Sequence, residues 1–130
     1  MEHKIRQLRK GILELAILKC LHQESHYGYS IIKTISERSE IELTEGTIYP
    51  ILSRLAKDDM VSSEWVESKQ GPPRKYYSLT PKGKKVYDTL IGEFERLTDM
   101  VTNVGGKQEE WQKSEEGKRI IVRKERQDEE

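Results

Sequence analysis

The sequence predicts a mainly α-helical fold with one small β-hairpin, and three observations lead to this prediction. Apolar residues recur at helical spacing in four separate segments of the 130-residue chain. Two β-rich segments flank a Gly-Pro-Pro turn at residues 71–73, which is typical of a hairpin. The last helical segment, residues 81–104, is long for a chain of this size.

The composition limits the class of protein. A chain of this length forms one domain with at most a small appendage. Its hydrophobic content of 34% is low and its charged content of 35% is high, so we expect dimerisation to complete a modest core. It has neither an apolar run that would span a membrane nor a signal-peptide pattern at its N-terminus. The single Cys20 cannot form an intramolecular disulfide and indicates a reducing, cytoplasmic location.

The first two helices are predicted over residues 5–22 and 28–38. The first is apolar on nearly all faces from Ile12 to Leu21. A helix of this kind is expected to be buried between its own domain and a partner subunit. Residues 25–29 interrupt the pattern and separate the two helices.

The third helix is predicted over residues 45–57. Thr44 is a suitable N-cap residue, and Glu45 suits the first turn because the helix dipole favours a negative charge there. Pro50 lacks one intrahelical donor and is expected to kink the helix or tighten its first turns. The apolar stripe consists of Ile48, Ile51, Leu52 and Leu55.

A hairpin and a long helix follow. The strands are predicted over residues 61–68 and 75–79. Thr80 is placed to cap the last helix, with Pro81 at its first position. Because the helix is long, its apolar stripe is expected to project from the domain and to serve in dimerisation. The stripe consists of Val86, Tyr87, Leu90, Phe94, Leu97, Val101 and Val104.

The chain therefore divides into three predicted parts. Residues 1–80 are expected to form one domain of three helices and a hairpin, and residues 81–104 a C-terminal dimerisation helix. Residues 105–130 are dominated by charge, and we expect a mobile or weakly helical tail.

Three short helices followed by a hairpin is the order of a winged helix-turn-helix, in which the third helix is the recognition element. The outward face of this helix is small, polar and almost free of charge, as a surface that enters a DNA groove requires. The alternative is a partly exposed helix with an ordinary polar face, but such a face would carry more Glu and Lys. The candidate DNA-binding residues here are Thr44, Gly46, Thr47, Tyr49, Pro50, Ser53 and Arg54.

The hairpin tip is the wing, and its Arg74 and Lys75 are candidates for phosphate or minor-groove contacts. The alternative is a solvated turn with incidental charge. The formal net charge of zero limits the affinity that phosphate neutralisation can supply. Local basic patches can survive a neutral total, and a second group of basic residues lies at the N-terminus: Lys4, Arg6, Arg9 and Lys10.

The chain resembles the PadR family of bacterial transcriptional regulators over about residues 8–104. Single motifs of this resemblance are weak, but the ordered set is specific. The motifs are Gly11-Ile12-Leu13-Glu14-Leu15 with Ile17-Leu18, Tyr27-Gly28-Tyr29 with Ile31-Ile32, Glu45-Gly46-Thr47-Ile48-Tyr49-Pro50 with Leu52 and Arg54-Leu55, and Gly71-Pro72 with Arg74-Lys75-Tyr76-Tyr77 and Leu79-Thr80 through Gly83. The single long C-terminal helix is similar to that of the smaller subgroup, which includes multidrug-sensing repressors.

The resemblance implies a homodimer that binds a palindromic operator in double-stranded DNA, usually as a repressor. It implies DNA contacts by Tyr49, Arg74 and Lys75, and packing of the last helix on the partner's first helix. Some relatives bind flat aromatic effectors between subunits, and Phe94 lies near the matching position, although a plain dimer core is the better interpretation of this residue. The residues assigned to the dimer or an effector are Ile5, Leu8, Ile12, Leu90, Phe94, Leu97 and Val101.

The sequence favours neither a metal site nor an enzyme. His3, His22 and His26 have no cysteine or carboxylate partners at ligand spacing. No Gly-rich phosphate loop, nucleophile motif or paired catalytic carboxylate is present, so we expect no cofactor. Two hypotheses remain: a dimeric DNA-binding repressor, and a winged-helix module that binds another protein without specific DNA affinity.

Overall fold

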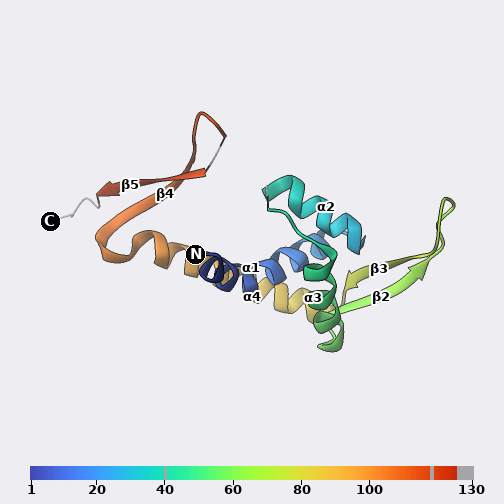
Figure 1. The fold of residues 1–130 in the computed structure, drawn as a ribbon. Coiled ribbons are helices and arrows are strands. Elements are labelled where there is room, and N and C mark those ends of the chain that lie inside the picture. The colour runs from blue at the N-terminus through green and yellow to red at the C-terminus, as the bar shows by residue number, and fades with distance from the viewer. Residues whose placement is uncertain (40, 118, 126–130) are drawn as a thin grey trace. The chain divides into compact units, whose positions relative to one another are not determined.

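A computed structural model describes residues 1–39, 41–117 and 119–125 (Figure 1). The helices are α1 (Glu2–Gln23), α2 (Gly28–Ser39), α3 (Glu45–Lys57) and α4 (Pro81–Asn103), followed by the short 3-10 helix η1 (Val104–Gly106). The strands are β1 (His26–Tyr27), β2 (Val61–Val66), β3 (Arg74–Leu79), β4 (Lys107–Lys113) and β5 (Arg119–Glu125). The chain forms two compact units, Met1–Leu90 and Ile91–Glu130.

The core of the first unit lies where α1, α2 and α3 pack together. Burial of a large aliphatic side chain stabilises a fold by about 1.5–3 kcal/mol. The fully buried side chains are Ile17, Leu18, Ile31, Ile48, Leu52 and Leu55. The mainly helical fold with a small hairpin is therefore confirmed, and α3 occupies the predicted residues, continuing through Pro50 without interruption.

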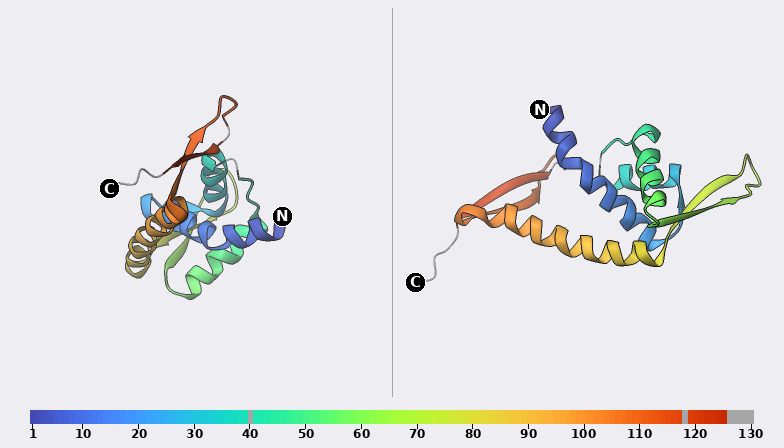
Figure 2. Two further views of the ribbon diagram at one scale, coloured as in Figure 1. Left: turned by 90° about the vertical axis from the view of Figure 1, so that its left-hand side faces the viewer. Right: turned by 90° about the horizontal axis from the view of Figure 1, so that it is seen from below.

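A three-stranded antiparallel sheet, in the order β1-β3-β2, completes the first unit. Its hairpin of β2 and β3 projects away from α1, α2 and α3 (Figures 1 and 2). The sequence did not predict β1, which pairs His26 with Tyr77 and Tyr27 with Tyr76. A strand of two residues has no detectable alternation, so only its long-range pairing with β3 defines it.

The hairpin strands differ from the prediction at the ends next to the turn, where the first is two residues shorter and the second, which begins at Arg74, is one residue longer. The strand predicted over residues 61–68 ends at Val66, which pairs with Arg74. Pro72 and Pro73 precede Arg74 and have no N–H to donate to a ladder. The residues between Val66 and Arg74 therefore form the loop at the tip of the wing.

The start of α4 is tied to the end of α3 through Thr80. The Thr80 hydroxyl accepts the backbone N–H of Gly83 at 3.0 Å, which confirms its role as helix cap. The same hydroxyl donates to the carbonyl of Asp59 at 2.6 Å, and the Thr80 N–H donates to the carbonyl of Met60 at 3.0 Å. A Cβ atom on Gly83 would lie 2.0 Å from the Met60 carbonyl oxygen. Only glycine permits this close approach.

In the second unit, the tail differs from the expectation. Strands β4 and β5 form an antiparallel hairpin where we expected a mobile or weakly helical segment over residues 105–130. Trp111 pairs with Ile121, and aromatic and β-branched residues favour strands even in a charged context. The many charged residues of β4 and β5 made this segment resemble a solvated tail in the sequence. The part of the predicted tail at residues 118 and 126–130 lies outside the described residues.

The contact at Gly83 predicts that Gly83→Ala destabilises the first unit by about 1–3 kcal/mol, because the methyl group would overlap the Met60 carbonyl. Urea denaturation measures the change in the free energy of unfolding. The matched control is Gly92→Ala on the same helix, where a Cβ atom would meet nothing within 4 Å. Since alanine is the better helix former, the control should be neutral or stabilising. Equal effects at the two positions would contradict the role of Gly83.

Candidate nucleic-acid interface

The exposed face of α3 carries the residues that the sequence selected. The helix buries Ile48, Ile51, Leu52 and Leu55 against the core, so its opposite face is open to solvent. The predicted residues on that exposed face and just before it are Thr44, Gly46, Thr47, Tyr49, Pro50, Ser53 and Arg54, and the charged residues Glu45 and Lys57 at the two ends of the helix are exposed as well. Small and polar groups dominate this set, and such a surface can approach base edges closely.

Thr44 occupies the N-cap position of α3, but its side chain does not cap the helix in the usual way. Its hydroxyl lies 3.2 Å from the hydroxyl of Thr47, while its carbonyl accepts the N–H groups of Thr47 and Ile48 at 3.1 Å. The two hydroxyls therefore form a polar pair at the exposed start of the helix.

Tyr49 is held over the start of α2. A Cβ atom on Gly28 would lie 2.5 Å from the Tyr49 hydroxyl oxygen and 2.7 Å from the ring carbon that bears it. Gly28 is buried, whereas Tyr49 remains 40% exposed. The side chain of Tyr49 is thus positioned by α2 and still faces solvent.

Tyr77 of β3 lies beneath the same surface. Its side chain is buried, and burial raises the pKa of its phenol, with a smaller contribution from Tyr49. A phenol of this kind keeps its proton throughout the physiological pH range. Tyr77 therefore anchors the wing to the core and remains neutral next to α3.

The wing places its two basic residues on aromatic rings. The Arg74 guanidinium lies 4.5 Å from the centre of the Tyr27 ring. The Lys75 ammonium lies 6.0 Å from the centre of the Trp65 ring and 5.8 Å from that of Tyr77. Cation–π contacts of this kind hold a long side chain in place without removing its charge. Sequence reasoning did not include Tyr27 or Trp65 in the site, because neither residue type signals a cation contact.

The wing and α3 border an open cavity of about 500 Å³. Two hydroxyl groups from α3, those of Tyr49 and Ser53, meet the basic residues Arg74 and Lys75 there. Donors of both kinds bind phosphate oxygens in protein–DNA complexes. The fold therefore brings two of the predicted helix residues, Tyr49 and Ser53, together with both predicted wing residues at one cavity.

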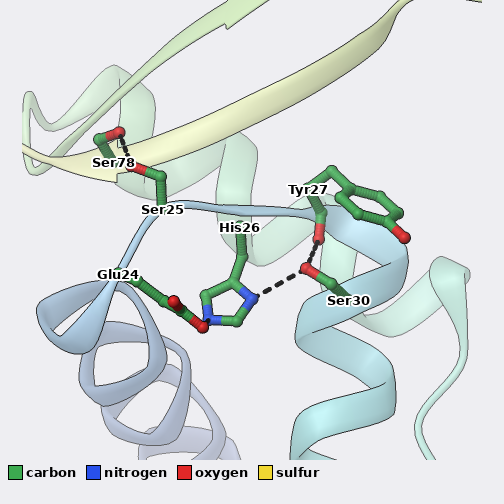
Figure 3. A network of polar contacts seen from close by, with 6 residues as sticks. All are labelled: Glu24, Ser25, His26, Tyr27, Ser30 and Ser78. Carbon is green, nitrogen blue, oxygen red and sulfur yellow. Dashed lines mark hydrogen bonds and ion pairs between the residues drawn. The ribbon is translucent and has the colours of Figure 1, made fainter. Parts of the chain in front are cut away.

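A polar network fixes β1, which carries Tyr27 toward the wing (Figure 3). The Ser30 hydroxyl donates to the Tyr27 carbonyl at 3.0 Å and lies 2.8 Å from His26 Nδ1. Since the single hydroxyl proton is used in the first bond, His26 Nδ1 carries a proton and donates to Ser30. The Ser25 hydroxyl reaches the Ser78 hydroxyl of β3 at 2.6 Å. This network ties the end of α1, β1 and the wing together.

The dimer candidates form exposed apolar faces on two helices. The apolar face of α1 consists of Ile5, Leu8 and Ile12. The apolar face of α4 consists of Leu90, Phe94, Leu97 and Val101. Each of these side chains is exposed in the single chain, and contiguous apolar surface of this kind marks an interaction site.

No other chemistry stands out in the part of the chain that the structure describes. No group of three or more His, Cys, Asp or Glu side chains could hold a metal ion among those residues. Their helices include none that is both long and apolar enough to cross a membrane. Cys20 is buried in α1, and burial raises the pKa of its thiol, so it is a structural residue rather than a reactive one.

The order of α1, α2 and α3, the exposed third helix and the projecting hairpin define a winged helix-turn-helix protein. The model of the PadR-like family of transcriptional regulators matches residues 17–89, which is more than half of the chain. The chain therefore belongs to the PadR-like family, whose members are transcriptional regulators rather than enzymes.

Solved structures agree with this assignment. The chain is 44% identical to a PadR-like transcription factor from Bacteroides fragilis, with a TM-score of 0.68 over 79% of this chain and 99% of that one. It is 33% identical to a PadR-like transcriptional regulator from Bacillus cereus, with a TM-score of 0.69 over 75% and 95%. An uncharacterised protein from Lysinibacillus sphaericus is 29% identical over 94 residues, 71% of this chain and 86% of that protein.

The contact between Gly28 and Tyr49 predicts the effect of Gly28→Ala. The new methyl group would occupy the space of the Tyr49 phenol, and the exposed side chain of Tyr49 would rotate away at little cost in stability. Because Tyr49 helps to raise the Tyr77 pKa, that pKa should fall, while burial keeps it above its ordinary value. An NMR titration of the tyrosine rings measures this shift. Gly11→Ala, which meets nothing within 4 Å, should leave the titration of Tyr77 unchanged.

Proposed function

We propose that this PadR-like regulator is a homodimer that binds a palindromic operator in double-stranded DNA and represses transcription from it. The observation that carries the proposal is the meeting of two α3 hydroxyl groups, those of Tyr49 and Ser53, with the basic residues of the wing at one open cavity. A regulator that binds operator DNA acts where that DNA lies, so the cytoplasm is its proposed location.

In this proposal, α3 enters the major groove. Thr47, Tyr49 and Ser53 offer hydroxyl groups to base edges and phosphates, and Arg54 can reach guanine or phosphate. Gly46 and Pro50 keep the backbone close to the groove floor because they carry little bulk and no charge. Base contacts of these kinds supply sequence specificity, whereas phosphate contacts supply register.

The wing contributes the phosphate contacts. Arg74 lies over the Tyr27 ring, which restricts its side chain and lowers the entropy lost when it binds, and Lys75 lies near Trp65 and Tyr77. This restriction matters in a chain whose net charge is zero, since non-specific attraction to DNA is weak.

Dimerisation would cover the exposed apolar faces of α1 and α4 and would present two copies of α3 to the two halves of a palindrome. Phe94 lies on the α4 face and is 38% exposed in the single chain. In the dimer it would pack in the interface core, or contact a small aromatic effector that releases the operator. Loss of a gel shift on addition of a planar aromatic compound would favour the effector.

The DNA-binding proposal predicts that Tyr49→Ala weakens operator binding roughly tenfold, because one base or phosphate contact is worth about 1–3 kcal/mol. A gel shift against the region upstream of the chain's own gene measures the affinity. Arg74→Ala combined with Lys75→Ala should weaken binding at all sequences and reduce the salt dependence by about 0.9 in log–log slope per lost phosphate contact.

The matched control for the wing variant is Lys84→Ala with Lys85→Ala, which removes two exposed charges from α4. This control should bind the operator with wild-type affinity if the position of the two cations, rather than the total charge of the protein, determines binding. Absence of any sequence-specific binding by the wild-type protein at physiological salt would instead favour the second hypothesis, a winged-helix module that binds another protein. The zero net charge is the observation behind that alternative.

The dimer proposal predicts that Leu97→Glu yields a monomer, because a charge buried in an apolar interface is costly. Sedimentation equilibrium measures the association state. Gly92→Glu introduces the same charge on the same helix at a position where a side chain meets nothing within 4 Å, about 140° around the helix from Leu97. The Gly92→Glu control should remain dimeric. If the Leu97→Glu variant is also a dimer, the apolar face of α4 is not the dimer interface.

A further inference from the structure

The N-terminal half of α1 carries a basic face that is separate from its apolar face. Arg6, Arg9 and Lys10 follow the spacing of neighbours on one side of a helix. At about 100° per residue, this basic face is centred about 120° from the apolar face of α1. A partner subunit that covers the apolar face therefore need not cover the basic one.

The basic face borders an open groove of about 570 Å³ that α3 closes on the other side. The α3 residues that line it include Gly46, Thr47, Pro50 and Arg54. Tyr49 and Ser53, by contrast, line the cavity beside the wing. The exposed face of α3 is thus flanked by cationic side chains on both sides: the wing on one, and α1 on the other.

The charge of this groove is unbalanced. Arg54 adds a fourth cation to those of the basic face, and Glu42 is the one carboxylate among the described lining residues. In the part of the chain that the structure describes, none of the four cations forms an ion pair with a carboxylate. Unpaired cations that converge on a groove attract an anion.

We propose that Arg6, Arg9 and Lys10 bind backbone phosphates of the operator at the edge of the major groove opposite the edge held by the wing. This inference rests on the proposed DNA-binding function and extends it to a second element. A helix in the major groove, which is about 12 Å wide, has a phosphate strand on each side. The groove beside α1 provides the second strand with a cationic surface.

The test compares Arg6→Gln combined with Arg9→Gln against the matched control Lys84→Gln combined with Lys85→Gln. Operator affinity is measured by fluorescence anisotropy over a range of salt concentrations. The α1 variant should bind about tenfold more weakly at low salt and lose about 0.9 in log–log slope for each phosphate contact removed. Glu42→Gln, which removes the carboxylate from the groove, should tighten binding.

Phosphate-ethylation interference locates the contacts on the DNA. The α1 variant should lose interference at one edge of each half-site, whereas the Arg74→Ala, Lys75→Ala variant should lose it at the other edge. Sedimentation equilibrium verifies that each variant keeps the association state of the wild type.

The outcomes separate this inference from the function on which it rests. If the wild-type protein binds its operator and the α1 variant matches its control in affinity, slope and interference, the inference is wrong and the proposed function stands. If the wild-type protein binds no operator, both are wrong.

Discussion

The surface proposed to bind DNA depends on the missing side chain of Gly28. Because no Cβ atom is present there, the Tyr49 ring of α3 rests directly on the start of α2. Tyr27, the preceding residue, pairs with β3 and supports Arg74 of the wing. The buried side chains of α3 place the helix in the core, and this contact sets the position of the Tyr49 ring relative to α2 and the wing. The hydrogen bonds among His26, Ser30 and the Tyr27 carbonyl hold the backbone on either side of Gly28.

The distribution of charge explains how a neutral chain can favour DNA. The cations beside α3 come from α1, from the end of α3 and from the wing. The face of α3 between them has few charges of its own. Phosphates would meet cations while bases meet small polar groups, which is the division of roles found in specific complexes. A modest total charge limits attraction to the wrong sequences.

Local signals predicted most of the fold. The apolar period of α3 and the cap at Thr80 placed α3 and the start of α4 correctly, because periodicity and capping act within a few residues. β1 was missed because His26 and Tyr27 become a strand only by pairing with β3, some fifty residues later. The hairpin of β4 and β5 was missed because Trp111 is the one apolar residue of β4 and charged residues flank the short apolar run of β5, residues 120–122. The candidate site was predicted by residue type, but the contacts of Tyr49 with Gly28 and of Arg74 with Tyr27 arise from tertiary packing that periodicity does not report.

The junction at Thr80 has a mechanical consequence. Only this residue separates β3 from α4, and its hydroxyl joins both to the turn after α3. A tilt of the first turn of α4 would therefore move Thr80 and, with it, the end of β3. In a dimer built on α4, the distance between the two wings would follow the angle at which the paired helices cross. A molecule that changed that angle would alter the fit to both half-sites together, without touching either DNA-facing surface.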